Sequence, residues 1–470
     1  MNVATVDKVR IVKLAVVLLL FCGLWFMPVP AGLTREAWRL FAIFAAAILS
    51  VVLNALPLLT SAVAACAFVV LTGTLTPAKA YGAFANPTVL LVVTAFLVSQ
   101  SVVKSGLGKR ISLYVVSLFG KSTLGLAYSV FITDTLISPG FPSNTARGGV
   151  LFPVILALAQ NSGSTPDDDS TRRLGGYLMF CGMASLAITS ALWFTATSGN
   201  PIGAGLAAEQ GLQVNFGSWL LASCVPSLVV IALLPLLLYR LFPPGITETP
   251  DAPEHARREL RTMGRMSTGE KITAATFAVM ITGWVLAAPY QLNLTAIALA
   301  GLATLLISGV LTLDDMHEQG GTLVTFIWLA VLFGISGQLN EMGFMGYVGE
   351  RLAMALEGLA WPLAYVSLLV IYVLMHYMFV SQNAQVLALL GVFLDVGVKS
   401  GVPVALMAYA LLFASSYFSV ITPQAGSQNI IFVASGYLKQ GELYRLGLLT
   451  TIFCLLVFLL VGTPWILWVT

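Results

Sequence analysis

The segment Ser138-Pro139-Gly140-Phe141-Pro142-Ser143-Asn144-Thr145 is a polar break inside an apolar run that extends from residue 122 to residue 160. An apolar arm lies on either side of this break. In a bilayer, backbone that leaves the helix is tolerated only where protein buries it or where it lines a cavity. The break therefore predicts a re-entrant hairpin, whose two arms enter and leave the membrane on the same face.

Three other apolar runs contain polar breaks. The run 363–398 is interrupted by Ser381-Gln382-Asn383, which predicts a second hairpin. The runs 175–209 and 403–436 are too long for one straight spanning helix. Polar segments divide them at Thr197-Ser198-Gly199-Asn200-Pro201 and at Thr422-Pro423-Gln424-Ala425-Gly426. We interpret these two runs as broken spans.

Composition places the whole chain in a membrane. Of its 470 residues 58% are hydrophobic and 9% are charged, whereas an ordinary soluble domain has about 25% charged residues. The mean hydropathy is +0.92. Because one soluble core could not bury so much apolar surface, the composition excludes a soluble enzyme, a disordered protein and a nucleic-acid binder. The cysteines and histidines show no metal-site or catalytic spacing, so we expect neither an enzyme nor an organic cofactor.

Eleven apolar runs are predicted to cross the membrane, because a spanning helix needs about 20 apolar residues. They lie near residues 11–28, 37–55, 57–73, 87–105, 175–209, 217–241, 270–288, 292–312, 322–340, 403–436 and 444–469. The predicted fold is therefore an all-α polytopic membrane protein, with about 11 transmembrane helices and two re-entrant hairpins.

The basic residues predict the orientation, because lysine and arginine concentrate in cytoplasmic loops. With the N-terminus in the cytoplasm, 17 of the 23 basic residues lie on the cytoplasmic side: Lys8, Arg10, Lys13, Lys104, Lys109, Arg110, Lys121, Arg172, Arg173, Arg240, Arg257, Arg258, Arg261, Arg265, Lys271, Lys439 and Arg445. The first hairpin then opens from the cytoplasm and the second from outside. We therefore expect a multi-pass protein of the inner (plasma) membrane, in contact with the lipid bilayer.

The two halves of the chain resemble each other. Ser143-Asn144-Thr145-Ala146-Arg147 parallels Ser381-Gln382-Asn383-Ala384-Gln385, and a broken span follows in each half. Because the hairpins open to opposite sides, we predict an inverted repeat, which is typical of secondary transporters. The predicted domains are an N-terminal half-repeat at 1–241 (hairpin 122–160, broken span 175–209), a cytoplasmic linker at 242–271, and a C-terminal half-repeat at 272–470 (hairpin 363–398, broken span 403–436).

The four polar breaks are the candidate binding site. A helix that begins inside the membrane presents unpaired N–H groups and the positive end of its dipole, and both attract anions. Freed carbonyls and small hydroxyls can coordinate sodium. The alternative for Ser143-Asn144-Thr145 is a plain helix cap, because serine, threonine and asparagine favour that position. We expect the breaks to enclose one small anion near the middle of the bilayer.

Charged and titratable residues inside the runs are further candidates. An intramembrane arginine is costly, so Arg147 is a functional candidate. It could pair with a substrate carboxylate or stand in for a bound cation; alternatively, it reaches the cytoplasmic face or pairs with Asp134 in the other arm. Asp134 and Asp395 could carry protons, although a place at an interface is favoured. His376 could bind or titrate, although a hydrogen-bonded packing role is favoured.

At these breaks the sequence resembles the divalent-anion:sodium symporter family, whose members carry dicarboxylates, citrate and sulfate. The resemblance is to its citrate/succinate, tartrate/succinate and 2-oxoglutarate/malate exchanger branch, and it rests on Pro142-Ser143-Asn144-Thr145-Ala146-Arg147-Gly148-Gly149, Gly199-Asn200-Pro201 and His376-Tyr377-x-Phe379-x-Ser381. It covers nearly the whole chain in the order of its spans. The resemblance implies a homodimer that carries a small anionic substrate.

The resemblance also implies a set of binding residues. Substrate would contact Ser143, Asn144, Thr145, Asn200, Pro201, Ser381, Gln382, Asn383, Thr422 and Pro423. Sodium, the one ion that the resemblance implies, would bind in two places: at Ser143, Asn144 and Gly199, and at Gln382 and Thr422. In exchanger members a basic side chain takes over part of sodium's electrostatic role, and Arg147 is the fixed-cation candidate.

The chain departs from the family pattern at the second tip, which reads Ser-Gln-Asn, and at Gln385, where the exchanger branch usually has histidine. We expect a secondary active transporter of small divalent organic anions, such as succinate, malate, 2-oxoglutarate and citrate, that works by alternating access as an exchanger. A sodium-coupled dicarboxylate or sulfate symporter is the first alternative. A passive anion channel or facilitator is the second, and it would need a continuous polar stripe rather than localised breaks.

Overall fold

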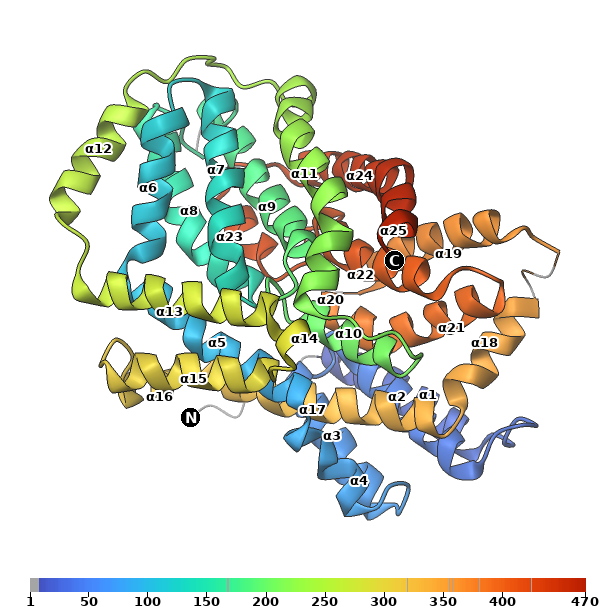
Figure 1. Ribbon diagram of the computed structural model, residues 1–470. Coiled ribbons are helices and arrows are strands. Elements are labelled where there is room, and N and C mark those ends of the chain that lie inside the picture. The colour runs from blue at the N-terminus through green and yellow to red at the C-terminus, as the bar shows by residue number, and fades with distance from the viewer. Residues whose placement is uncertain are drawn as a thin grey trace. The chain divides into compact units, whose positions relative to one another are not determined.

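The computed structural model describes residues 8–166, 169–318, 320–354, 356, 358–379, 381–423 and 425–470. In these residues the regular structure is helical, apart from an isolated bridge between Ser122 and Glu248. Six helical segments are long and apolar enough to cross a membrane (Figure 1): α5 (Pro87–Ser105), α9 (Gly175–Leu192), α11 (Phe216–Leu241), α17 (Gly320–Glu341), α19 (Trp361–Met375) with η4 (His376–Met378), and α24 (Gln440–Val457) with η7 (Phe458–Gly462) and α25 (Thr463–Val469). The predicted class, an all-α polytopic membrane protein, is confirmed.

Further helices complete the fold. Three apolar segments among them are shorter than the six spanning ones: α3 (Leu58–Leu71), α15 (Leu294–Ile307), and α22 (Val404–Tyr417) with η6 (Phe418–Val420). The others are α1 (Lys8–Phe26), α2 (Arg35–Val52), α4 (Pro77–Gly82), η1 (Ala83–Ala85), α6 (Leu107–Phe119), α7 (Thr123–Ile137), η2 (Ser138–Gly140), α8 (Asn144–Asn161), η3 (Asp169–Arg172), α10 (Gly199–Ala208), α12 (Ala252–Met263), α13 (Thr268–Val285), α14 (Ala287–Tyr290), α16 (Leu313–Glu318), α18 (Phe344–Met354), α20 (Gln382–Gln385), η5 (Val386–Leu390), α21 (Gly391–Lys399) and α23 (Asn429–Ala434).

The described residues form two compact units. Unit 1 contains those of 1–93, 202–213 and 319–407, and unit 2 contains those of 94–201, 214–318 and 408–470. Each unit therefore combines segments from both halves of the chain. The half-repeats and the linker that we derived from the sequence stay a prediction.

Unit 1 combines contacts between helices that follow each other in the sequence with contacts between distant ones. Helix α2 packs between α1 and α3, and the hydroxyl oxygens of Ser50 and Ser61 lie 2.7 Å apart where α2 meets α3. Helix α17 packs against α2, α3 and α4. Helix α21 packs against α18 and α19, which places the second predicted hairpin in this unit.

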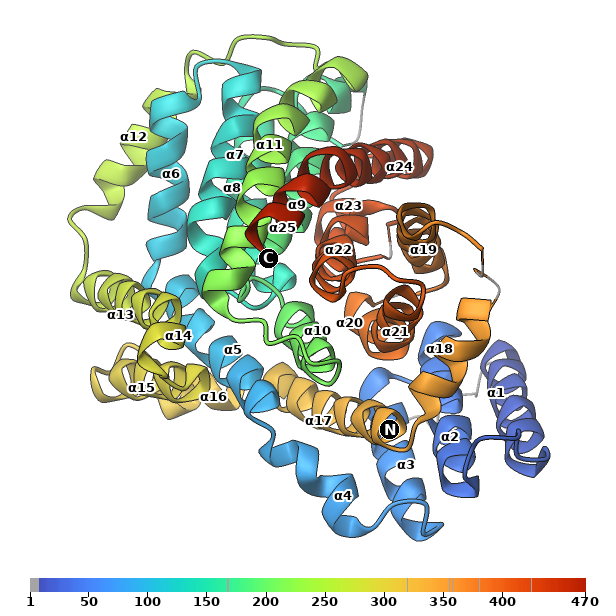
Figure 2. The same cartoon turned by 45° about the vertical axis from the view of Figure 1, so that its right-hand side comes forward.

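Unit 2 is organised around α9. All of its residues are buried, and it packs against α7, α8 and α11, as Figure 2 shows. Glycine, alanine and serine supply much of its length, and such small residues let helices in membranes approach closely. A Cβ on Gly182 would lie 2.6 Å from the Phe432 ring and 2.8 Å from Ile155. Gly182 therefore allows α8 and α23 to meet against α9.

Some helices at corresponding places in the chain order have equal lengths. Helices α3 and α15 have 14 residues each, and α4 and α16 have 6 each. Helices α7 and α19, which precede the two polar tips, have 15 residues each, and each continues into a short 3-10 turn. Other corresponding helices differ, such as α5 with 19 residues and α17 with 22, and the repeat stays a prediction.

Candidate functional site

The first hairpin tip begins helix α8. Pro142 restricts the residue before it to extended backbone, and Phe141 has φ −127° and ψ 101°. Ser143 then caps the helix, because its Oγ accepts a hydrogen bond from the N–H of Ala146 at 3.2 Å. The cap role that we weighed as the plain alternative is thus present. It also leaves the N-terminal N–H groups of α8 at the tip, where an anion would be stabilised.

Arg147 is fully buried and forms an ion pair with Asp134, whose side chain is also 0% exposed. The distance between Arg147 Nη1 and Asp134 Oδ1 is 3.0 Å. Of the four roles that we considered for Arg147, the structure shows the pairing across the hairpin. A buried charge needs such a partner, because an isolated ion in a low dielectric costs far more than a paired one.

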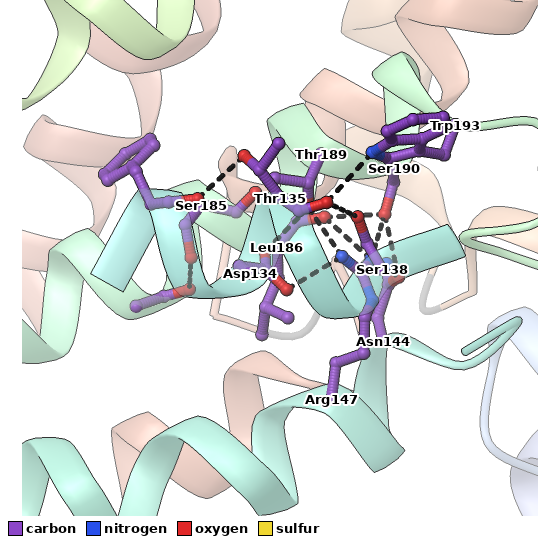
Figure 3. A network of polar contacts seen from close by, with 12 residues as sticks. Asp134, Thr135, Ser138, Asn144, Arg147, Ser185, Leu186, Thr189, Ser190 and Trp193 are labelled. Carbon is purple, nitrogen blue, oxygen red and sulfur yellow. Dashed lines mark hydrogen bonds and ion pairs between the residues drawn. The ribbon is translucent and has the colours of Figure 1, made fainter. Parts of the chain in front are cut away.

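The arginine is the centre of a wider polar network, drawn in Figure 3. Nη1 also donates to Thr189 Oγ1, which in turn lies 2.6 Å from Asp134 Oδ2. Nη2 lies 2.6 Å from Asn144 Oδ1, 2.5 Å from Ser190 Oγ and 3.1 Å from the Leu186 carbonyl oxygen. The guanidinium therefore ties the hairpin tip on α8 to the last turns of α9 and to α7.

The first broken span separates α9 from α10. Asn200 stabilises the break, because its Nδ2 donates to the carbonyl oxygens of Ser190 at 2.7 Å and Trp193 at 3.0 Å. Carbonyls at the end of a helix lack partners within the helix, and this amide satisfies that of Ser190. The Trp193 carbonyl oxygen also accepts from the N–H of Ala196 at 3.1 Å. Gly199 and Pro201 flank Asn200 in the first turn of α10.

The second broken span repeats this arrangement around Asn429. Its Nδ2 donates to the carbonyl oxygens of Ser419 at 2.7 Å and Thr422 at 3.0 Å, residues ten and seven positions earlier in the chain, as for Asn200. The counterpart of Ser198-Gly199-Asn200 is therefore Ser427-Gln428-Asn429, beyond the segment 422–426 that we chose from the sequence. Within that segment, Gln424 lies outside the described residues.

The sequence carried one signal for this counterpart, the serine and asparagine that recur at the same spacing in 198–200 and 427–429. The first tip reaches this part of unit 2 directly, because Thr145 Oγ1 lies 2.7 Å from Ser427 Oγ. Thr422 Oγ1, Gln428 Oε1 and Asn429 Oδ1 are buried and have no hydrogen-bond partner among the described residues. These oxygens can accept a donor or contact a cation.

The second hairpin tip also has a serine cap, but a neutral glutamine stands where the first tip has Arg147. Ser381 Oγ accepts a hydrogen bond from the N–H of Ala384 at 3.4 Å, which caps α20. Gln385 takes the place that Arg147 has after its own cap. Its Oε1 lies 2.6 Å from His376 Nδ1, and its Nε2 donates to the Tyr372 carbonyl oxygen at 2.7 Å. His376 thus has the hydrogen-bonded packing role.

The structure groups the predicted site residues by unit. Unit 2 contains the first tip, Arg147 and the binding residues of both broken spans, Gly199, Asn200, Pro201, Thr422 and Pro423. Unit 1 contains Ser381, Gln382 and Asn383 of the second tip. Asp395, also in unit 1, pairs with Lys399 at 2.8 Å and belongs to neither tip. In the described residues no group of three or more His, Cys, Asp and Glu side chains could hold a metal ion.

Sequence reasoning missed several members of the network. Thr189, Ser190 and Ser419 stand at the ends of apolar helices, where a single hydroxyl is unremarkable in sequence. The segment Thr189-Ser190-Ala191 does resemble the exchanger branch in sequence, but that likeness gives these residues no role. Their contacts with Arg147, and that of Ser419 with Asn429, place them in the network.

Known proteins resemble this chain over nearly its full length. It is 38% identical over 461 residues to the "Putative malate transporter YflS" of Bacillus subtilis, covering 98% of this chain and 96% of that protein. It is 35% identical to "Dicarboxylate transporter 2, chloroplastic" of Spinacia oleracea, covering 93% and 79%. It is 32% identical to "Inner membrane protein YbhI" of Escherichia coli, covering 98% of each.

Solved structures share the fold at low sequence identity. The YdaH transporter of Alcanivorax borkumensis superposes with a TM-score of 0.59 and 18% identity, covering 86% of this chain and 88% of that one. MtrF of Neisseria gonorrhoeae gives a TM-score of 0.59 with 15% identity, covering 96% and 97%. Residues 8–470 match the family described as "Sodium:sulfate symporter transmembrane region". This chain therefore belongs to that family of membrane transporters.

Proposed function

We propose that this protein is a secondary active transporter that exchanges small divalent organic anions, such as succinate, malate, 2-oxoglutarate and citrate, by alternating access. Two of the relatives described above carry malate or dicarboxylate in their names. The observation that carries the proposal is the first tip, where the N-terminus of α8 lies behind a serine cap and a buried guanidinium holds Asn144. Backbone N–H groups, hydroxyls and amide N–H groups are the donors that bind carboxylates.

The position of the Arg147 guanidinium at the first tip supports exchange rather than cation-coupled transport. The Arg147 guanidinium bonds the tip at Asn144 and the end of α9 at Ser190. These hydrogen bonds of the guanidinium join the tip to the broken span, so no transported cation is needed to bring those two elements together. No covalent intermediate is required at any step.

Uptake of labelled succinate into proteoliposomes tests this function. Vesicles are left empty or preloaded with unlabelled dicarboxylate, each with and without an inward sodium gradient. Uptake into preloaded vesicles only, and indifferent to sodium, is the result we expect. Uptake into empty vesicles without any gradient would indicate a passive facilitator. No uptake of succinate, citrate or sulfate in any condition would refute the proposal.

A sodium-coupled symporter is the second candidate, and the second broken span favours it. Its three unpartnered buried oxygens, on Thr422, Gln428 and Asn429, are the kind of ligand that sodium prefers. Uptake into empty vesicles that requires sodium would select this candidate.

We also propose the arrangement in the membrane that the sequence indicates: a homodimer with a cytoplasmic N-terminus. Cross-linking in membranes followed by denaturing electrophoresis tests the dimer, and a monomer band alone would contradict it.

A further inference from the structure

The charge of Arg147 is balanced inside the protein. Its guanidinium and the Asp134 carboxylate are both 0% exposed and lie 3.0 Å apart. Thr189 bonds both groups and closes the pair into a ring of three side chains. Because the desolvation of two ions is recovered only by close pairing with further hydrogen bonds, the two charges act as one neutral unit.

The same network determines which way the Asn144 amide points. Its Oδ1 lies 2.6 Å from Arg147 Nη2 and 2.8 Å from Ser190 Oγ, and Nη2 can only donate. An amide turned over would place its NH2 group against the guanidinium, donor facing donor. The network therefore fixes Oδ1 toward Arg147 and directs the Nδ2 group, which can donate to an anion, away from it.

The corresponding position in the second hairpin also carries no net charge, but it is occupied by an uncharged residue instead of an ion pair. Gln385, at the place after the cap that corresponds to Arg147, is uncharged and is also fully buried. Its Nε2 donates to the main-chain carbonyl of Tyr372, which stands thirteen residues earlier, as Asp134 does before Arg147. The position four residues after the cap serine is thus paired with an acid in the first hairpin, where it is the basic Arg147, and with a main-chain carbonyl in the second, where it is the neutral Gln385.

We propose that Asp134 is a positioning residue for transport: it neutralises Arg147 and thereby locks the guanidinium that holds Asn144 with its donor group directed away from the network. Arg147 then serves the anion through the orientation of Asn144 and contributes no net positive charge. This inference rests on the proposed function, because Asn144 must contact the transported anion.

The test combines Asp134→Asn and Asn144→Ala, alone and together, in proteoliposomes. Asp134→Asn keeps the side-chain shape and removes the compensating charge. We expect it to raise KM for the dianion about tenfold in the wild-type background, a coupling of ordinary size for residues in one network. In the Asn144→Ala background the same change should leave KM unaltered, since its route to the substrate is gone. Thr189→Val, which removes one bridging hydroxyl, should give a smaller rise if Asp134→Asn folds poorly.

The opposite results are distinct. A lower KM in Asp134→Asn would mean that an unmasked cation attracts the anion directly, which overturns the proposal. An equal rise in both backgrounds would show a merely structural pair. Asp395→Asn, which breaks the Lys399 pair in unit 1, is the matched control and should leave KM unchanged.

A second measurement needs no substrate and keeps the inference separate from the proposed function. Thermal unfolding is compared for Asp134→Asn, Arg147→Gln and the double variant. The double variant should be more stable than the Asp134→Asn variant, because the latter keeps a buried Arg147 charge that nothing compensates and the double variant has no such charge. Additive losses would refute the neutral pair, whatever the protein transports.

Discussion

Two asparagine side chains stabilise the breaks in the broken spans, because each donates hydrogen bonds to main-chain carbonyls where a helix ends. Asn429 and Asn200 each donate to two carbonyls at the same spacing. Both amides are nearly inaccessible to solvent. The Thr422 and Trp193 carbonyls also accept from backbone N–H groups at 3.1 Å. The bonds to Ser419 and Ser190 are therefore the ones whose loss leaves a buried acceptor without a partner. Such a loss costs about 1–3 kcal/mol.

Asn429→Ala should therefore lower the free energy of unfolding by about 1–3 kcal/mol, measured by thermal unfolding in detergent. Ile430→Ala, at the exposed neighbouring position, is the control and should change stability little. An unfolding temperature for Asn429→Ala equal to that of Ile430→Ala would show that the amide does not hold the break.

The two tip asparagines should be needed for transport itself. Asn144→Ala and Asn383→Ala each remove one donor proposed to contact a substrate carboxylate, and a hydrogen bond to a charged group contributes about 1.5–3 kcal/mol. We expect kcat/KM for succinate to fall ~10- to 100-fold in each variant, at equal amounts of folded protein. Both variants transporting at the full rate would mean that the site lies elsewhere.

At the scale of elements, the close contact of three helices depends on one missing side chain. Gly182 of α9 faces Phe432 of α23 and Ile155 of α8, with no room for a Cβ. Helix α8 carries the first tip and α23 is the second helical part of the second broken span, so this contact joins the two parts of the site that unit 2 contains.

Gly182→Leu should force α9, α8 and α23 apart and destabilise the protein by about 1–3 kcal/mol, as overpacking usually does. Uptake should fall with it. Gly149→Leu, on α8, is the matched control, because a Cβ there meets nothing within 4 Å. If Gly182→Leu and Gly149→Leu reduce uptake equally, the close contact of α9 with α8 and α23 at Gly182 is not what uptake depends on.

The interruptions of helices at the polar breaks were the most predictable features. Polar residues such as Ser143 and Ser381 stand out inside apolar runs, because backbone cannot leave a helix in lipid without help. The register of the second broken span was not predictable, since segment 422–429 offers several hydroxyls and amides of similar type. Only the bonds of Asn429 single out the counterpart of Asn200. The pairing of Arg147 with Asp134 was one of several alternatives, because spacing across a break says little about contact.

For the whole molecule, composition sufficed to predict the class, whereas the grouping of segments into two compact units was not readable from the sequence. The stretch 242–271 is the longest polar stretch of the sequence, and its helix α12 has exposed arginines at 257, 258 and 261. The predicted orientation places this stretch in the cytoplasm.

Trypsin should therefore cleave within 252–266 in inverted membrane vesicles and spare this stretch in right-side-out vesicles. The fragments are identified by mass spectrometry. Cleavage in right-side-out vesicles only would reverse the orientation, and with it the faces from which the two hairpins open.

The buried pair of Asp134 and Arg147 has a consequence for the membrane potential. One elementary charge that crosses the whole potential changes the energy by about 2.3 kcal/mol per 100 mV. A first hairpin that contains both members of the pair contributes no net charge from them when it moves. The exchange of one dianion for another also moves no net charge across the membrane. The exchange rate should thus be the same in vesicles held at zero or at a potassium diffusion potential. A steep dependence on voltage would reveal a charge that the pair leaves uncompensated.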